Sequence, residues 1–268
     1  MSGGEESRPV VEMENVVFSY DGAPVLQDVD LTVEDGEFCA LIGPNGGGKT
    51  TLIKLMLGLL QPDAGTVRLL GREPKMSAAL AGYVPQRVPA DTGFPVSVMD
   101  VALMGRLRGP GGQFRFSGRD REAAREALER LGMWPHRHRR IGRLSGGQRQ
   151  RVIIARALAA EPRVLFLDEP GSSVDPTGQA DLYRLLRELN RTITIVLVSH
   201  EIMTLSSYVK SVACVNRKVH YHGSSEMTQD MLDMAYECPV ELVAHGVPHR
   251  VLRTHDDDRD HGHGDDDA

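Results

Sequence analysis

The segment from Phe38 to Thr50 reads FCALIGPNGGGKT and carries the clearest structural signal in this chain. Its apolar first part predicts a short buried strand, and the part from Gly43 onward fits the pattern GxxxxGK[ST]. Glycines at this spacing let the backbone wrap around phosphate groups, and the helix that follows adds its positive end. We therefore expect a nucleotide-binding loop and helix start made of Gly43, Pro44, Asn45, Gly46, Gly47, Gly48, Lys49, Thr50 and Thr51.

The elements expected around this loop predict an α/β fold. Alternating apolar residues from Val10 to Val33, with a turn at Asp21–Gly22, predict antiparallel strands ahead of the loop. Apolar spacing predicts a helix over residues 49–60 after it. In the second half of the chain strands alternate with helices, which implies a parallel sheet covered by helices. The elements expected there are a helix to about residue 160, a strand at 164–167, a helix at 176–190 and a strand at 192–198.

The middle of the chain has a different residue pattern from the segments on either side. Helix-like segments at 96–106 and 120–131 are separated by the connector RGPGGQFRFSG, and we interpret about residues 87–144 as an inserted helical subdomain. The whole is then a P-loop ATPase core with a parallel sheet, an N-terminal antiparallel β subdomain and a helical insertion. We divide the chain into an ATPase domain, an extension and a disordered His/Asp-rich tail, at residues 1–235, 236–254 and 255–268.

Composition and charge exclude several classes of protein. No stretch approaches the roughly 18 apolar residues of a spanning helix, and the acidic N-terminus lacks the features of a secretory signal, so we expect a cytoplasmic protein. The net charge of −6 equals the charge of the last fourteen residues, which hold seven Asp and one Arg. The rest of the chain is neutral overall, which disfavours DNA or RNA as a partner. Cys39, Cys214 and Cys238 form no CxxC pair and suit reduced thiols.

Two carboxylates follow the apolar strand that ends at Leu167. A P-loop enzyme needs a carboxylate on a neighbouring strand to hold Mg²⁺ through its water shell, and Asp168 lies where this strand leaves the sheet. Glu169, one residue further on, is placed to polarise a water molecule. Many strands end in acidic turns, so this pattern carries weight only together with the glycine loop.

The segment LSGGQ, at residues 144–148, opens another predicted helix. Ser145 can cap this helix, and Gly146 and Gly147 leave backbone N–H groups bare, so that Ser145, Gly146, Gly147 and Gln148 form a second phosphate cradle. The glycine loop, LSGGQ and the Asp-Glu strand occur in that order. Over about residues 10–225 the chain therefore resembles the ATP-binding subunit of an ABC transporter.

The resemblance implies roles for further residues. It implies that Tyr20 stacks on adenine, that Gln86 contacts Mg²⁺ and the attacking water, and that His200 holds the γ-phosphate. From the residues alone, a tyrosine on a strand face and a structural histidine are the alternatives. Residues 172–175 stand at the family's D-loop but read Ser-Ser-Val-Asp instead of the commoner Ser-Ala-Leu-Asp. The expected catalytic residues are Glu169, His200, Lys49 and Gln86, and the expected Mg²⁺ site is Thr50, Gln86 and Asp168.

The resemblance also implies cofactors and partners. It implies ATP and Mg²⁺, and a homodimer in which LSGGQ of one subunit closes over ATP held by the other. It further implies integral membrane permease subunits, indirectly a solute-binding protein, and a place at the cytoplasmic face of the cell membrane. The segment from Phe94 to Met104 either forms the groove for a permease helix or is ordinary core. An importer subunit fits a single ATPase domain best, with an exporter subunit and a soluble ABC ATPase as alternatives.

Two segments, one near the C-terminus and one around residue 174, bear on which substrate is transported. The segment Cys238–Leu252 and the tail resemble the zinc/manganese-type importers, and Ser173–Pro176 resembles that branch's Gly-Val-Asp-Pro. A chelated-iron or cobalamin importer is the alternative, and zinc is not distinguished from manganese. The tail's three His and seven Asp either bind metal loosely or serve as a solubilising acidic tail.

Overall fold

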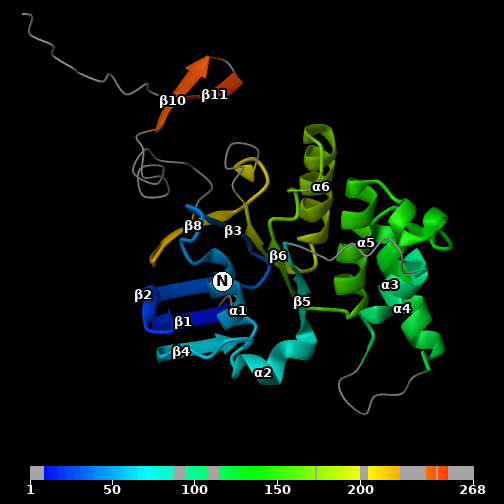
Figure 1. The fold of residues 1–268 in the computed structure, drawn as a ribbon, viewed down its shortest axis with the longest axis horizontal. Coiled ribbons are helices and arrows are strands. Elements are labelled where there is room, and N and C mark those ends of the chain that lie inside the picture. The colour runs from blue at the N-terminus through cyan, green and yellow to red at the C-terminus, as the bar shows by residue number, and fades with distance from the viewer. Residues whose placement is uncertain are drawn as a thin grey trace, which may run out of the picture.

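The computed structural model describes residues 9–86, 95–107, 115–172, 174–199 and 205–223, together with the backbone of two strands near the C-terminus. Those two strands, β10 (Val240–His245) and β11 (Val247–Leu252), pair antiparallel with each other. The other described residues form two sheets and a group of helices, as Figure 1 shows. No helix among them is long and apolar enough to cross a membrane.

The first sheet is antiparallel, as predicted. Strand β1 (Pro9–Tyr20) pairs with β2 (Ala23–Glu34), and the turn between them has positive φ at both Asp21 and Gly22. Two such residues are the signature of the tight hairpin turn whose twist suits paired strands. The third strand, β4 (Ala64–Leu69), pairs with the other edge of β1, which gives the order β2-β1-β4. The sequence analysis missed β4 because five of its six residues are not buried.

The second sheet is the mostly parallel core. Its order is β5-β6-β7-β3-β8-β9, parallel except for the antiparallel β9. Strand β3 lies between β7 and β8, and every residue of β3, β6 and β7 is buried, as continuous apolar runs predict. The six strands are β3 (Phe38–Ile42), β5 (Ala81–Val84), β6 (Val164–Asp168), β7 (Thr194–Val198), β8 (Ser211–Asn216) and β9 (Lys218–His222).

Helices cover both faces of this core. One apolar cluster joins the core sheet to the antiparallel sheet and to α1 (Lys49–Met56), and a second joins its other face to α6 (Pro176–Leu189) and the helical subdomain. The helix predicted over 49–60 is shorter than expected. It ends at Met56 because Gly58, with φ of 69°, turns the chain in the left-handed conformation that stops helices. A single turn, α2 (Pro74–Ser77), follows β4.

The inserted helical subdomain is also present. Its helices α3 (Val98–Met104) and α4 (Gly118–Arg130) pack on each other and on α5 (Gly146–Ala159), which follows the predicted insertion, at the end of the molecule away from β1, β2 and β4 (Figure 1). Each begins with a capping box, formed by Ser97, Ser117 and Ser145 respectively. Helix α5 contacts β5 as well, so it joins this subdomain to the core. The described residues also contain 3₁₀ turns at Ala78–Leu80, Trp134–His136 and Ile141–Arg143.

Candidate functional site

The glycine loop connects the buried end of β3 to the first residue of α1. Gly43, Gly46 and Gly48 all have positive φ, which residues with side chains rarely adopt. A Cβ atom on Gly43 would overlap the carbonyl oxygen of Val215 on the neighbouring strand β8, and one on Gly47 would lie 2.7 Å from the same oxygen. The loop therefore needs glycine both for its backbone shape and for its close approach to β8.

Lys49, the first residue of α1, is buried under this loop. Its Nζ donates hydrogen bonds to the carbonyl oxygens of Gly43 at 2.9 Å and Pro44 at 2.8 Å. Burial lowers the pKa of its ammonium, and the nearby carboxylates of Glu169 and Asp168 raise it. The side chain is thus held inside the loop, where it can meet a phosphate group.

Thr50 and Asp168 meet at the carboxyl end of the core sheet. The Thr50 hydroxyl donates to Oδ2 of Asp168 at 2.8 Å, while Oδ1 of Asp168 is buried without a hydrogen-bond partner. Burial raises the pKa of Asp168, with the Thr50 hydrogen bond opposing it. An unpartnered buried carboxylate oxygen beside a hydroxyl suits a hard divalent cation such as Mg²⁺, which binds oxygen ligands. Thr51 lies buried in the next position of α1.

Glu169 and Gln86 come together from neighbouring strands. Gln86 follows β5 and Glu169 follows β6, and because these strands are parallel their carboxyl ends lie side by side. Nε2 of Gln86 donates to Oε2 of Glu169 at 2.5 Å. Glu169 has a φ of 48°, which is uncommon for a residue with a side chain, and its N–H donates to the Val198 carbonyl oxygen at 3.0 Å. The backbone at Glu169 is therefore held in an energetically unfavourable conformation, which fixes the point from which the Glu169 side chain extends.

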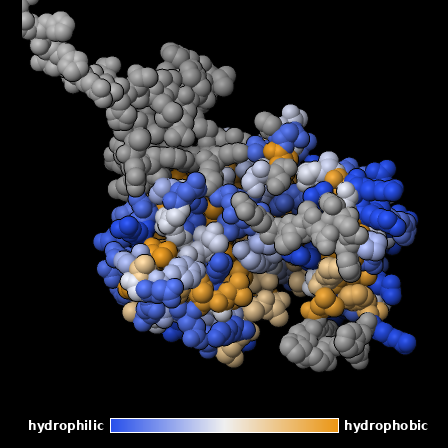
Figure 2. Space-filling view, in the orientation of Figure 1, coloured by the Kyte–Doolittle hydropathy of each residue, from blue (hydrophilic) through white to orange (hydrophobic). Residues whose placement is uncertain are grey.

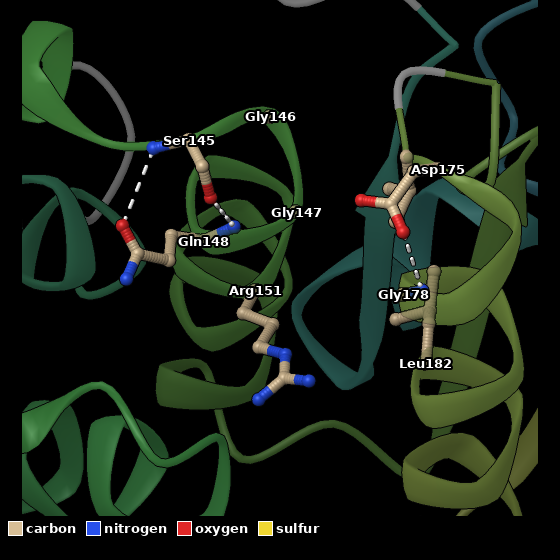
Figure 3. A pocket seen from close by; sticks show the side chains of 9 residues that line it. Ser145, Gly146, Gly147, Gln148, Arg151, Asp175, Gly178 and Leu182 are labelled. Atoms are coloured by element: carbon tan, nitrogen blue, oxygen red, sulfur yellow. Dashed lines mark hydrogen bonds between the residues drawn. The ribbon is translucent and has the colours of Figure 1, made fainter.

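The signature loop, defined here as Leu144–Gln148, caps α5. The N–H of Gln148 donates to the Ser145 hydroxyl at 3.3 Å, and the N–H of Ser145 donates back to Oε1 of Gln148 at 3.2 Å. The loop borders a cavity of about 280 Å³, across which the start of α5 faces the start of α6 (Figure 3). Two helix N-termini directed at one cavity favour an anion there. The lining residues are Ser145, Gly146, Gly147, Gln148, Arg151, Val174, Asp175, Gly178 and Leu182.

The structure brings most, but not all, of the expected site residues together. Lys49, Thr50, Asp168, Glu169 and Gln86 form one group at the glycine loop. The side-chain contacts of Ser145 and Gln148 in the signature loop are with each other, at the start of α5.

Tyr20 and His200 stand apart from that group. Tyr20, at the end of β1, is 42% exposed and packs edge-to-face on Phe18 with ring centroids 4.8 Å apart, which leaves ring surface free for stacking. His200 and Ser173 lie outside the described residues, as do Phe94 and the tail. The roles expected for them stay predictions.

The sequence analysis missed some roles and residues near the site. Asp175 was expected only as part of the D-loop; it also caps α6 by accepting from the N–H of Gly178 at 2.9 Å, a role that the Asp-Pro pair at 175–176 could have revealed. Arg151 and Leu182 carry no such signal, because their place on the cavity depends on the approach of α5 to α6. Tyr83 is similar: burial and then the charge of Asp168 raise the pKa of its hydroxyl, which follows from the pairing of β5 with β6.

Comparisons with known proteins identify the family of this chain. Residues 26–172 match the ABC transporter family. The chain is 39% identical over 228 residues to the zinc uptake system ATP-binding protein ZurA of Listeria innocua, covering 83% of this chain and 89% of that one. It is 40% identical over 217 residues to the manganese transport system ATP-binding protein MntB of Bacillus subtilis, covering 81% and 87%.

A solved structure gives the same result for the fold. The protein cbiO1 from Clostridium perfringens, part of an ABC transporter complex, superposes with a TM-score of 0.72 at 28% identity, covering 82% of this chain and 90% of that one. The resemblance identified from the glycine loop, LSGGQ and the Asp-Glu strand is thus confirmed. The chain belongs to the ABC transporter family, as one of its ATP-binding subunits with ATPase activity.

Proposed function

We propose that this subunit hydrolyses ATP to drive a membrane importer for zinc or manganese. The observation that carries the hydrolytic part is the pair of contacts at the end of the core sheet. Thr50 bonds Asp168 beneath the glycine loop, and Gln86 bonds Glu169 on the adjacent strands. These contacts support the proposal, because Thr50 and Asp168 would supply oxygen ligands and Glu169 a general base near the terminal phosphate.

The proposed mechanism assigns each of these residues a step. The glycine loop binds the phosphates through its N–H groups, and Lys49 turns from the carbonyl oxygens of Gly43 and Pro44 to the β- and γ-phosphates. Thr50 and Asp168 would hold Mg²⁺, with Gln86 beside them; when bound, the ion neutralises charge on the phosphate oxygens. Glu169 accepts a proton from the water that attacks the γ-phosphate, and ADP leaves as the leaving group.

The active unit in this proposal is a dimer. The signature loop offers a cavity bordered by two helix N-termini, yet its described contacts do not include the glycine loop of the same chain. A second copy can supply the missing half, so that each ATP lies between the glycine loop of one copy and the signature loop of the other. Closing and opening of this clamp would move the permease.

The permease is proposed to dock near the end of α3. Met104 and Leu107 are 39% and 63% exposed there, although Val98, Val101 and Ala102 of the same helix are buried. Figure 2 shows apolar surface gathered over the helical subdomain with hydrophilic residues around it. Exposed apolar side chains in such a setting favour a protein contact. This surface is continuous with the segment expected to form the groove, whose first residue lies outside the described part.

Replacing both Met104 and Leu107 by Glu should prevent assembly with the permease while ATP binding stays unchanged. The charges would have to be buried in the contact without partners, which is costly. Co-purification with the tagged permease and equilibrium binding of ATP measure the two properties. Leu59→Glu is the matched control, because Leu59 is 62% exposed and lies beyond α1. Normal assembly of the double variant would place the docking surface elsewhere.

The metal part of the proposal rests on the relatives, whose names state zinc uptake and manganese transport. Its test is transport by the complete system, reconstituted with its permease and solute-binding protein in membrane vesicles. Uptake of radioactive zinc or manganese should require ATP and should disappear in Lys49→Ala. Uptake of a ferric chelate or cobalamin, with neither metal transported, would reject the assignment and favour the alternative importer class.

A further inference from the structure

The chain before residue 255 has no net charge, but it contains a strongly basic region. Residues 130–160 contain eight Arg and no Asp or Glu. Five basic residues fall within 137–143, a segment we call the arginine loop: Arg137, His138, Arg139, Arg140 and Arg143. Such a concentration of one charge creates a local positive potential even though the protein as a whole is acidic.

The structure holds the arginine loop in a defined shape. The N–H groups of Val98 and Met99, at the start of α3, donate to the carbonyl oxygens of Arg139 at 2.9 Å and Arg137 at 3.0 Å. A bridge between Ser97 and Arg140 adds to this attachment. With the backbone fixed, the side chains of His138, Arg139, Arg140 and Arg143 line an open cavity of about 600 Å³. The loop is thus a preformed basic surface on the helical subdomain.

The exposed guanidinium groups of this surface have no acidic partner among the described residues. Elsewhere exposed arginines pair with carboxylates, for example Arg125 with Glu129 at 2.9 Å and Arg184 with Asp181 at 2.8 Å. For Arg139, Arg140 and Arg143, no described carboxylate lies within the 4.0 Å of an ion pair. Three like charges around one cavity repel one another, and several carboxylates placed between them would remove that repulsion.

The same chain carries a matching acidic segment. Its last fourteen residues, 255–268, contain seven Asp and one Arg. This segment is therefore negatively charged, whereas the arginine loop is positively charged. Sixteen residues lie between Gly223 and β10, and sixteen follow β11. At up to ~3.3 Å per residue these could span on the order of 100 Å, more than the ~45 Å diameter expected for a domain of this size.

We propose that the Asp-rich tail, residues 255–268, binds to the arginine loop of its own chain. Aspartate carboxylates form paired, charge-assisted hydrogen bonds with guanidinium groups, and aligned carboxylates can engage several arginines at once. The tether raises the effective concentration of the tail, so that individually weak ion pairs suffice for binding. Salt weakens this contact because it screens charges that interact at the protein surface.

Binding at this place has a consequence for the nucleotide site, which rests on the function proposed above. Arg143 directly precedes the signature loop, so a bound tail brings carboxylates beside the cradle that should receive a phosphate. The tail carboxylates and the phosphate would repel each other there, so a bound tail hinders closure of the two copies around ATP. Neutralising the tail should therefore raise ATP turnover at low salt, by about two- to fivefold, since a few exposed charges exert modest effects.

Energy transfer within the full chain tests the binding directly. Trp134, the only tryptophan, stacks on Arg137 with the guanidinium 4.5 Å from the ring centroid, so it marks the arginine loop. A dansyl acceptor is attached to Ala268→Cys in a Cys238→Ser background, where Cys39 and Cys214 are buried and unreactive. We expect strong transfer at low salt that is unchanged on dilution and lost near ~0.5 M salt.

Two variants of the full chain should abolish the transfer. They are the triple change Arg139→Ser, Arg140→Ser and Arg143→Ser, and the replacement of all seven tail Asp by Asn. The matched control is Arg184→Ser, Arg187→Ser and Arg191→Ser on or next to α6, which removes the same charge from another exposed surface. Equal transfer in the arginine-loop triple variant and its parent would overturn the proposal, as would transfer that falls on dilution. Energy transfer is measured without ATP, so it tests tail binding alone. The ATPase assay tests the proposed function separately.

Discussion

Glu169→Gln should bind ATP normally but hydrolyse it on the order of 10²–10⁴-fold more slowly, the range lost with a general base. The amide keeps the size of the carboxylate and can still accept from Nε2 of Gln86, so the local geometry survives. It cannot take the proton of the attacking water. ATP should therefore hold two copies together, and sedimentation in Mg-ATP should show a stable dimer.

The control for this prediction is Glu188→Gln, the same change at an exposed residue of α6. It should hydrolyse ATP at the normal rate and should show no trapped dimer. Near-normal turnover by Glu169→Gln would remove Glu169 from the reaction and leave the proton acceptor unassigned.

Lys49→Ala should fail one step earlier, at nucleotide binding. The ammonium group is buried with only the carbonyl oxygens of Gly43 and Pro44 as its described hydrogen-bond partners, so it is already desolvated and placed to meet a phosphate. Losing one member of such a buried charged contact costs about 2–5 kcal/mol, which weakens ATP binding on the order of 10²-fold or more. Isothermal titration with ATP measures the change.

Lys54→Ala is the matched control, since Lys54 lies in the last turn of the same helix α1. It should bind ATP as the parent does, and both variants should keep the unfolding temperature close to that of the parent. If Lys49→Ala bound ATP with unchanged affinity, the lysine would serve only to hold the loop through Gly43 and Pro44.

The features predicted from the sequence were those encoded by neighbouring residues. The strand β3, the glycine loop and the start of α1 form one continuous pattern, and the hairpin β1–β2 is marked by alternation and by Asp21–Gly22. The apolar runs of β6 and β7 similarly reveal strands that are buried on both faces. In each case a short segment contains both the periodicity and its end signal.

The features missed depend on residues far apart in the chain. Strand β5 is only four residues long and pairs with β6, which lies far later in the chain, and β8 pairs with β3, which lies far earlier. The hydrogen bond from Gln86 to Glu169 joins residues 83 positions apart. Their closeness was expected only because a family resemblance implied it. Arg151 and Leu182 were missed for the same reason, since no local pattern shows that α5 and α6 meet.

The central claim is that each ATP site is shared between two copies, and mixing two inactive variants tests it most directly. Lys49→Ala disables the glycine loop, and Gly147→Asp places a negative charge in the signature loop. A Cβ atom on Gly147 meets only Val174 Cγ1, at an ordinary 3.5 Å, and an acidic residue suits the first turn of α5, so the fold should be kept. Each variant alone should be inactive.

In an equal mixture, half of the dimers contain one copy of each variant, and each such dimer has one site with both halves intact. One site in four is then intact, so the account predicts that mixing restores roughly a quarter of the parent's ATPase rate at the same total protein concentration. The measurement is the steady-state ATPase rate of the mixture against that of each variant alone at the same total concentration. A mixture as inactive as its components, or activity of Gly147→Asp on its own, would contradict the shared site.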